Sequence, residues 1–166
     1  MKANATRTAA LKSRISHQKN QSLNLNDWIF ENLSVPEEGH ILELCCGTGS
    51  QTIYLSERIK SGSITSVDIN PESLEVAEEN VGTSLVRFIH SDIDTTDNFL
   101  DRDYDLIFVS YGFYYSKEPQ TLLSRLVERL SPQGRIAIIG PVQGNNAELF
   151  SLVRKLGVKI PPTVTD

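Results

Sequence analysis

Short apolar segments alternate with amphipathic stretches through most of this sequence, and that alternation limits the folds it can adopt. The segments rich in aliphatic or β-branched residues predict strands at His40–Cys45, Ser63–Val67, Leu85–Ile89, Tyr104–Val109 and Arg135–Ile139. Helical spacing of apolar residues fills most of the intervals, while a polar loop separates the third and fourth strands. Strands that alternate with helices predict an α/β fold with a doubly wound, mainly parallel sheet. Such sheets bind ligands at the carboxyl ends of their strands.

Capping residues set the expected limits of the helices. Asn70 followed by Pro71 predicts a helix start, and Gly82 predicts its end. Further helices are expected over residues 50–60 and 119–130, because both segments carry an apolar face.

The two ends of the chain are expected to be helical as well. Asn26 is expected to cap an early helix, and Asn145 or Asn146 a last one. We therefore expect a helical N-terminal arm over residues 1–35 and one ligand-binding domain over residues 36–166.

The charge is unevenly distributed and bears on the choice of partner. The chain has 16 basic and 21 acidic residues, for a net charge of −5. Its first 26 residues contain five basic residues and no acid, leaving 11 basic and 21 acidic residues, a net charge of −10, in the rest. A body this acidic disfavours nucleic acid as a partner. The basic arm has three open interpretations: contact with an anionic substrate or nucleic acid, an organelle transit peptide, or a solvated helix.

Several classes of protein are not supported by the sequence. No run approaches the roughly 18 apolar residues of a membrane span, and no apolar segment follows Lys2 as in a secretory signal. Cys45 and Cys46 are adjacent, which excludes a disulfide framework and a four-ligand zinc site built from cysteines. We therefore expect a cytoplasmic protein without a membrane segment or a bound metal.

The turn after the first strand carries the most specific chemical signal. Glu43 lies inside the strand, and Gly47 and Gly49 follow in the turn, where glycine lets a ligand approach the backbone closely. A dinucleotide-binding turn would have a third glycine at the position of Thr52. A carboxylate repels a pyrophosphate and attracts an ammonium group. The turn therefore favours a ligand with an amine and a sugar over one with a diphosphate.

This turn resembles the first motif of the class I S-adenosylmethionine-dependent methyltransferases, and the resemblance covers about residues 41–140. The family has an acid followed by glycines at alternate positions, which correspond here to Glu43, Cys45, Gly47 and Gly49. Cys45 departs from the family's first glycine. The resemblance implies S-adenosyl-L-methionine as the cofactor and a Rossmann-like sheet in the strand order 3-2-1-4-5.

The resemblance also implies the remaining residues of a cofactor site. Asp68, at the end of the second strand, is the expected acceptor from both ribose hydroxyls, and Ile69 would lie against the adenine face. Asp92 is expected to bind the adenine amino group, with the Ile93 amide turned to the ring. Ser110, at the end of the fourth strand, completes this candidate set.

Structural interpretations of the same residues stay open. Glu43 could be a salt-bridged or edge residue of the strand, Asp68 a helix cap, and Asp92 a cap or turn residue of a loop. Cys45 and Cys46 fit small packing positions better than redox sensors, because no resolving cysteine is evident.

The resemblance implies transfer of a methyl group from a sulfonium to a nucleophile. The donor is already activated, so the protein mainly supplies alignment and exclusion of water, and no catalytic residue can be assigned. The segment from Val109 to Gly112 lacks the tetrapeptide associated with methylation of planar amino groups, so an unidentified small-molecule acceptor is favoured. The alternatives are a non-catalytic partner subunit, a truncated form that binds only the cofactor, and a nicotinamide-dependent oxidoreductase.

The two ends of the candidate domain leave further expectations. Only residues 158–166 follow Gly157, and Pro161 lies among them, so we expect the family's C-terminal antiparallel hairpin to be missing. The fifth strand would then be an edge that pairs with a second copy or a partner, unless the chain is a truncated form. Four aromatic residues follow the fourth strand, as either a substrate wall or a core patch: Tyr111, Phe113, Tyr114 and Tyr115.

Overall fold

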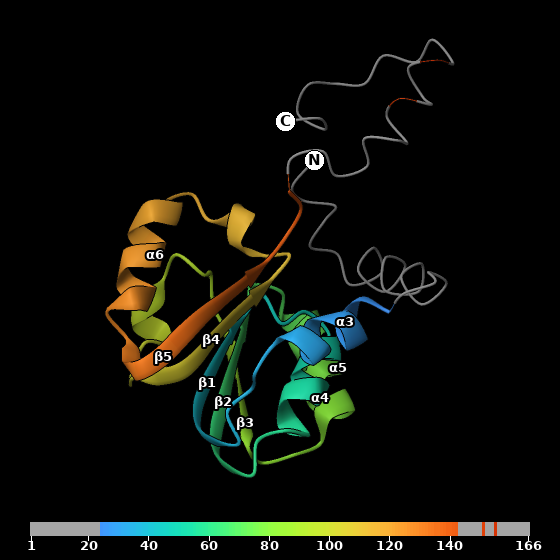
Figure 1. Ribbon diagram of the computed structural model, residues 1–166, viewed down its shortest axis with the longest axis vertical. Coiled ribbons are helices and arrows are strands. Elements are labelled where there is room, and N and C mark those ends of the chain that lie inside the picture. The colour runs from blue at the N-terminus through green and yellow to red at the C-terminus, as the bar shows by residue number, and fades with distance from the viewer. Residues whose placement is uncertain (1–23, 143–150, 152–154, 156–166) are drawn as a thin grey trace.

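The computed structural model describes residues 24–142 together with Ser151 and Lys155. It contains one five-stranded sheet in the order β3-β2-β1-β4-β5, and every neighbouring pair is parallel (Figure 1). The strands are β1 (Glu38–Leu44), β2 (Ser61–Asp68), β3 (Val86–His90), β4 (Tyr104–Ser110) and β5 (Leu130–Ile139). The predicted doubly wound α/β class and the strand order are confirmed.

Helices cover both faces of the sheet. They are α3 (Leu25–Asn32), α4 (Ser50–Ser56), α5 (Pro71–Val81) and α6 (Pro119–Val127), with short 3₁₀ turns η1 (Thr96–Asn98) and η2 (Phe113–Tyr115). Figure 1 shows α3, α4 and α5 on one face and α6 on the other. The predicted polar loop between β3 and β4 is present and contains only η1.

The core lies on both faces because the side chains of a strand alternate between them. Along β4, Leu106 and Phe108 belong to the cluster under α3 and α4, whereas Ile107 and Val109 belong to the cluster under α6. All four are completely buried. A continuous apolar run is therefore the pattern of a central parallel strand, as expected.

Local hydrogen bonds cap both α5 and α3, but the predicted cap residue is confirmed only for α5. The Asn70 side chain accepts from the Ser73 amide at the start of α5, and Gly82 ends the helix at a φ of 58°. The cap of α3 is Asn24 and not Asn26, because the Asn24 side chain accepts a hydrogen bond from the Asn26 amide. The prediction of Asn26 was wrong by two residues.

The helices expected over residues 50–60 and 119–130 are both shorter in the structure. The first ends at Ser56, and the Lys60 amide donates to the Glu37 carbonyl as the chain enters β2. The second ends at Val127, and Leu130 already pairs with Tyr104 as the first residue of β5. Residues 131–134, which precede the expected strand, lie within β5 as an irregularity where the register between β4 and β5 shifts.

Some predictions lie outside the described residues. These are most of the last helix, in which only Ser151 and Lys155 are described as helical, and the first 23 residues of the N-terminal arm. Across residues 24–142, β5 pairs with β4 alone. No helix in the described part of the chain is long and apolar enough to cross a membrane.

Candidate cofactor site

The turn from β1 to α4 is built from left-handed backbone conformations. Cys45, Gly47 and Gly49 have φ of 60°, 57° and 78°. Gly49 is also the N-cap of α4, where a Cβ would lie 3.0 Å from the Cβ of Ala77. The turn lies at the carboxyl end of the sheet, which is where ligands bind in this fold, and its glycines place no side chain between the backbone and a ligand.

Cys45 adopts a conformation that favours glycine, which accounts for the glycine usual at this position in the family. Its side chain lies against Gly112, where an added Cβ would overlap the Cβ and Sγ of Cys45. Burial raises the pKa of both the Cys45 and Cys46 thiols. The thiols are therefore protonated at neutral pH and act as packing groups.

Asp68 ends β2 directly beneath this turn. Its Oδ2 accepts from the Gly47 amide at 2.8 Å, and its Oδ1 accepts from the Asn70 amide at 2.9 Å. Burial raises the pKa of Asp68, an effect opposed by hydrogen bonds from the Asn70 and Gly47 amides. The carboxylate thus joins the glycine turn to the start of α5.

Glu43 lies one level deeper on the same face of the sheet. Only 1% of it is exposed, and its Oε2 accepts from Thr52 Oγ1 at 2.6 Å and from Ser66 Oγ at 2.8 Å. Its Oε1 is buried with no hydrogen-bond partner. Burial raises the pKa of Glu43 to about 7. Glu43 makes no ion pair in the described structure, so the open alternative of a salt-bridged strand residue is not what is found.

The loop after β3 holds the two residues expected near adenine. Asp92 Oδ1 accepts from the Asp94 amide at 3.0 Å, and its Oδ2 lies 3.5 Å from the Lys117 ammonium. The Ile93 side chain is buried in the cluster under α6, so only its backbone could face a ligand. Ile69, by contrast, is 50% exposed next to Asp68 and offers an apolar surface.

The sequence analysis missed Gln51, in the first turn of α4. Its Nε2 donates to Ser110 Oγ at 2.9 Å and to Asn26 Oδ1 at 3.2 Å. It therefore links the end of β4 to α3 across the opening of the candidate site. Asn26 and Ser110 lie 25 and 59 residues from Gln51 in the sequence, so local sequence patterns do not predict these contacts.

The aromatic cluster after β4 divides between core and surface. Phe113 and Tyr115 are partly buried against the cluster under α6, whereas Tyr111 and Tyr114 are 40% and 48% exposed. Tyr111 has a φ of 53° and its amide donates to the Ile139 carbonyl. The core interpretation therefore holds for Phe113 and Tyr115, and the substrate wall stays a prediction for Tyr111 and Tyr114.

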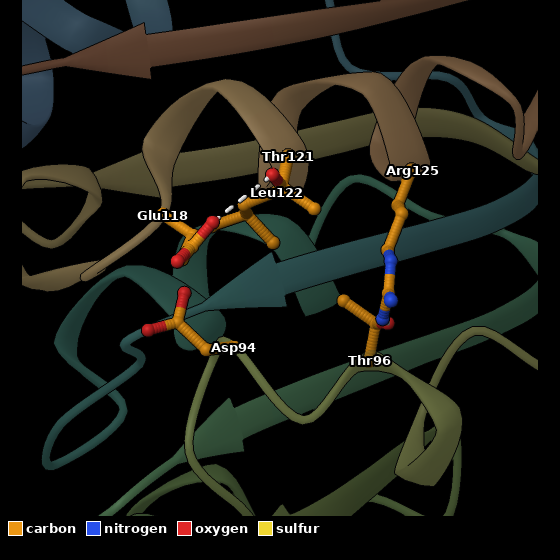
Figure 2. A pocket seen from close by; sticks show the side chains of 6 residues that line it. All are labelled: Asp94, Thr96, Glu118, Thr121, Leu122 and Arg125. Atoms are coloured by element: carbon orange, nitrogen blue, oxygen red, sulfur yellow. Dashed lines mark hydrogen bonds between the residues drawn. The ribbon is translucent and has the colours of Figure 1, made fainter.

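A pocket of about 240 Å³ lies beside these loops on the α6 face. Its lining residues are Asp94, Thr96, Glu118, Thr121, Leu122 and Arg125. Figure 2 shows Arg125 reaching from α6 to Thr96, and its Nη1 donates to Thr96 Oγ1 at 2.7 Å. Asp68 and Glu43 belong to the other face, whereas Asp94 of this pocket donates its amide to Asp92 of the candidate cofactor site.

The described residues contain no group of three or more His, Cys, Asp or Glu side chains arranged to hold a metal ion.

Comparisons with known proteins place this geometry in a family. The family model described as a methyltransferase domain matches residues 41–134. A demethylmenaquinone methyltransferase of Lactobacillus johnsonii is 27% identical over 128 residues, covering 73% of this chain and 52% of the relative. A malonyl-[acyl-carrier protein] O-methyltransferase of Priestia megaterium is 31% identical over 115 residues, covering 69% and 41%. The chain thus spans about half the length of the curated relatives it matches.

Solved structures support the fold at lower identity. A plantazolicin methyltransferase, in complex with a triazolic desmethylplantazolicin analogue and S-adenosylhomocysteine, matches with a TM-score of 0.65 and 22% identity, covering 95% of this chain and 62% of that chain. Coclaurine N-methyltransferase, bound to N-methylheliamine and S-adenosylhomocysteine, matches with a TM-score of 0.62 and 24% identity, covering 72% and 37%. By its sheet, its glycine turn and the match over residues 41–134, this chain belongs to the class I S-adenosylmethionine-dependent methyltransferases.

Proposed function

We propose that this chain binds S-adenosyl-L-methionine at the turn after β1 and transfers its methyl group to a small-molecule acceptor. The observation that carries the proposal is the Asp68 carboxylate, which is held by the Gly47 amide at the end of β2. An ionised carboxylate at this place is a strong acceptor for the two hydroxyls of a ribose.

Other features of the same turn fit the donor. The buried Glu43 Oε1 has no partner, and a cationic amino group would favour the ionised form of this carboxyl. The exposed face of Ile69 suits an aromatic base. Since Glu43 is almost completely buried, we propose that it acts on the amino end of the donor chiefly through the turn that it supports.

The donor, when bound, supplies a methyl group activated by a positively charged sulfur. The residues of the chain then need to orient the reactants and exclude water, which can lower the barrier by about 7–11 kcal/mol. Tyr111 and Tyr114 present apolar surface beside the carboxyl end of β4 and would form part of an acceptor wall. An acceptor that must lose a proton would also need a general base, which no described residue identifies.

The acceptor class rests on the charge of the chain and on its relatives. The net charge of −5 disfavours a nucleic-acid acceptor. The names of the two curated relatives refer to a quinone precursor and to an acyl group on a carrier protein. We propose a small or carrier-bound acceptor of this general kind.

The test is calorimetric titration with S-adenosylhomocysteine, S-adenosylmethionine and NAD. Binding of the first two and not of NAD is expected. Asp68→Ala should weaken S-adenosylhomocysteine binding about ten- to hundredfold, through loss of about 1.5–3 kcal/mol of hydrogen bonding to a charged acceptor.

Asn70→Ala is the matched control, because it removes the cap of α5 and leaves the Asp68 carboxylate in place. It should lower stability by about 1 kcal/mol and preserve the affinity. Equal losses of affinity in the two variants would mean that Asp68 is only a structural residue. Donor binding without transfer to any acceptor in a screen for methylated products would instead support a non-catalytic partner subunit.

A further inference from the structure

The loops that follow β3 and β4 are joined by a small set of side-chain contacts. Ser116 Oγ donates to Asp94 Oδ1 at 2.5 Å, and the Lys117 amide donates to Asp94 Oδ2 at 2.9 Å. The Lys117 ammonium also lies 3.5 Å from Asp92 Oδ2. The carboxylates of Asp92 and Asp94 thus both contact the loop of residues 111–117.

The two loops have different places in the proposed reaction. The loop after β3 carries Asp92, the expected contact of the donor's adenine. The loop after β4 carries Tyr111 and Tyr114, the exposed aromatic side chains of the proposed acceptor wall. The contact made by Asp94 therefore connects the donor side of the site to its acceptor side.

We propose that Asp94 is a positioning residue, which holds the loop of residues 111–117 against the loop of residues 91–95 and so couples donor binding to the arrangement of the acceptor wall. This inference rests on the proposed function and goes beyond it. Asp94 itself touches neither reactant, because both of its carboxylate oxygens are occupied by the other loop.

Lys117 makes the coupling sensitive to the donor. Its ammonium is paired with Asp92 in this structure, so an adenine amino group that binds Asp92 displaces it. The pair is exposed on the lysine side, with 75% of that side chain accessible, and such pairs are easily broken. The backbone of Lys117 stays attached to Asp94 while its side chain is released, so the loop keeps its place when the donor enters.

The electrostatics of Asp94 fit a permanent contact. Burial raises its pKa, but hydrogen bonds from Ser116 and the Lys117 amide outweigh that effect and the pKa lies below its ordinary value. The carboxyl group is therefore ionised at neutral pH, and its hydrogen bonds are charge-assisted.

Asp94→Asn tests the proposal by hydrogen exchange of residues 111–117. The asparagine amide keeps the shape but removes the charge, so its hydrogen bonds to Ser116 Oγ and to the Lys117 amide are no longer charge-assisted. In the ligand-free protein, exchange in this segment should become about tenfold faster. Asp97→Asn is the matched control, because Asp97 is an exposed acid of the same loop, in η1, and should leave the exchange unchanged.

Hydrogen exchange with S-adenosylhomocysteine added distinguishes a positioning role of Asp94 from a general contribution to the stability of the fold. In the parent it should slow exchange over residues 91–95 and over residues 111–117. In Asp94→Asn it should still bind and protect residues 91–95, but the protection of residues 111–117 should be lost. Ser116→Ala should reproduce this result, and the double variant should be no worse than either single one.

The outcomes are distinct. Equal protection of residues 111–117 in the parent and in Asp94→Asn would overturn the proposal, as would unchanged exchange in the ligand-free variant. If the parent shows neither a calorimetric binding signal nor slower hydrogen exchange with S-adenosylhomocysteine, the proposed function is overturned, and so is the coupling to donor binding. The comparison of the ligand-free proteins would still test the contact between the two loops.

Discussion

Replacing Glu43 with glutamine removes the ionisation of a buried carboxyl while keeping its shape. Thr52 and Ser66 both donate to Oε2, and Oε1 has no partner. A protonated glutamic acid fits this pattern with its carbonyl oxygen at Oε2. Glutamine can adopt it too, with its amide oxygen in that place and its amide nitrogen at the position of Oε1. The variant should therefore resemble the parent wherever the parent is neutral at this position.

The pKa of Glu43 sets the size and the sign of the difference. It is about 7 in the folded protein, against an ordinary value of 4.5, and burial is the main cause. Since the folded state binds this proton more tightly, the stabilisation is complete below pH 4.5 and is lost as the pH rises through 7. The full loss corresponds to about 3 kcal/mol, or about 6–12 °C in Tm for a chain of this length.

Urea denaturation of the parent and of Glu43→Gln at pH 5.5 and pH 8.5 measures this difference. The variant should already be more stable by about 1.4 kcal/mol at pH 5.5, because the unfolded parent ionises above pH 4.5, and by up to about 3 kcal/mol at pH 8.5. Glu75→Gln is the control, because it removes an exposed carboxylate of α5. If the free energy of unfolding of the parent and of Glu43→Gln has the same pH dependence, the Glu43 carboxyl is ionised in the folded protein. The reasoning would then fail.

Three other outcomes are expected. Above pH 7 Glu43→Gln should bind S-adenosylmethionine more weakly than the parent, and equal affinity would remove the electrostatic part of its assignment. Gly112→Ala should lower the free energy of unfolding by about 1–3 kcal/mol, because the added Cβ would overlap Cys45. In a double-mutant cycle measured by urea denaturation, most of this loss should disappear when Cys45 is replaced by glycine. Equal losses with and without Cys45→Gly would contradict the contact. If the β5 edge pairs with a second copy or a partner, light scattering should detect the complex, whereas a monomer with slow-exchanging amides over residues 136–139 would refute that pairing.

Much of the fold follows from local chemistry in the sequence. The cap and the proline of α5 are adjacent, the final glycine acts at the other end of the helix, and the structure has all three in the predicted roles. Asn24 and Asn26 could each cap a helix locally. Asn26 instead accepts from Gln51, a contact between two helices that local sequence cannot reveal.

The junction between α6 and β5 shows the same limit in the strands. Residues 131–134 have the composition of a turn, but Leu130 and Arg135 both pair with β4, on either side of the irregularity. A Cβ at Gly134 would lie 2.5 Å from the Tyr104 carbonyl oxygen, so glycine permits this close approach. The backbone of a distant strand, and not local propensity, decides where β5 begins.

The depth of each acid in the sheet assigns the two carboxyl groups of the candidate site to different tasks. Glu43 is paired in register with Ser66 on β2, and Asp68 follows two residues later on the same face. Two residues of a parallel strand are about 6–7 Å of rise, which is enough to place Asp68 at the rim and Glu43 beneath the turn. Burial raises the pKa of both, but it is Glu43 that reaches about 7. Loss of the Asp68 carboxyl should therefore weaken donor binding itself, whereas loss of the Glu43 carboxyl should change chiefly the pH dependence of stability and binding. That contrast separates a direct contact with the donor from support of the turn that receives it.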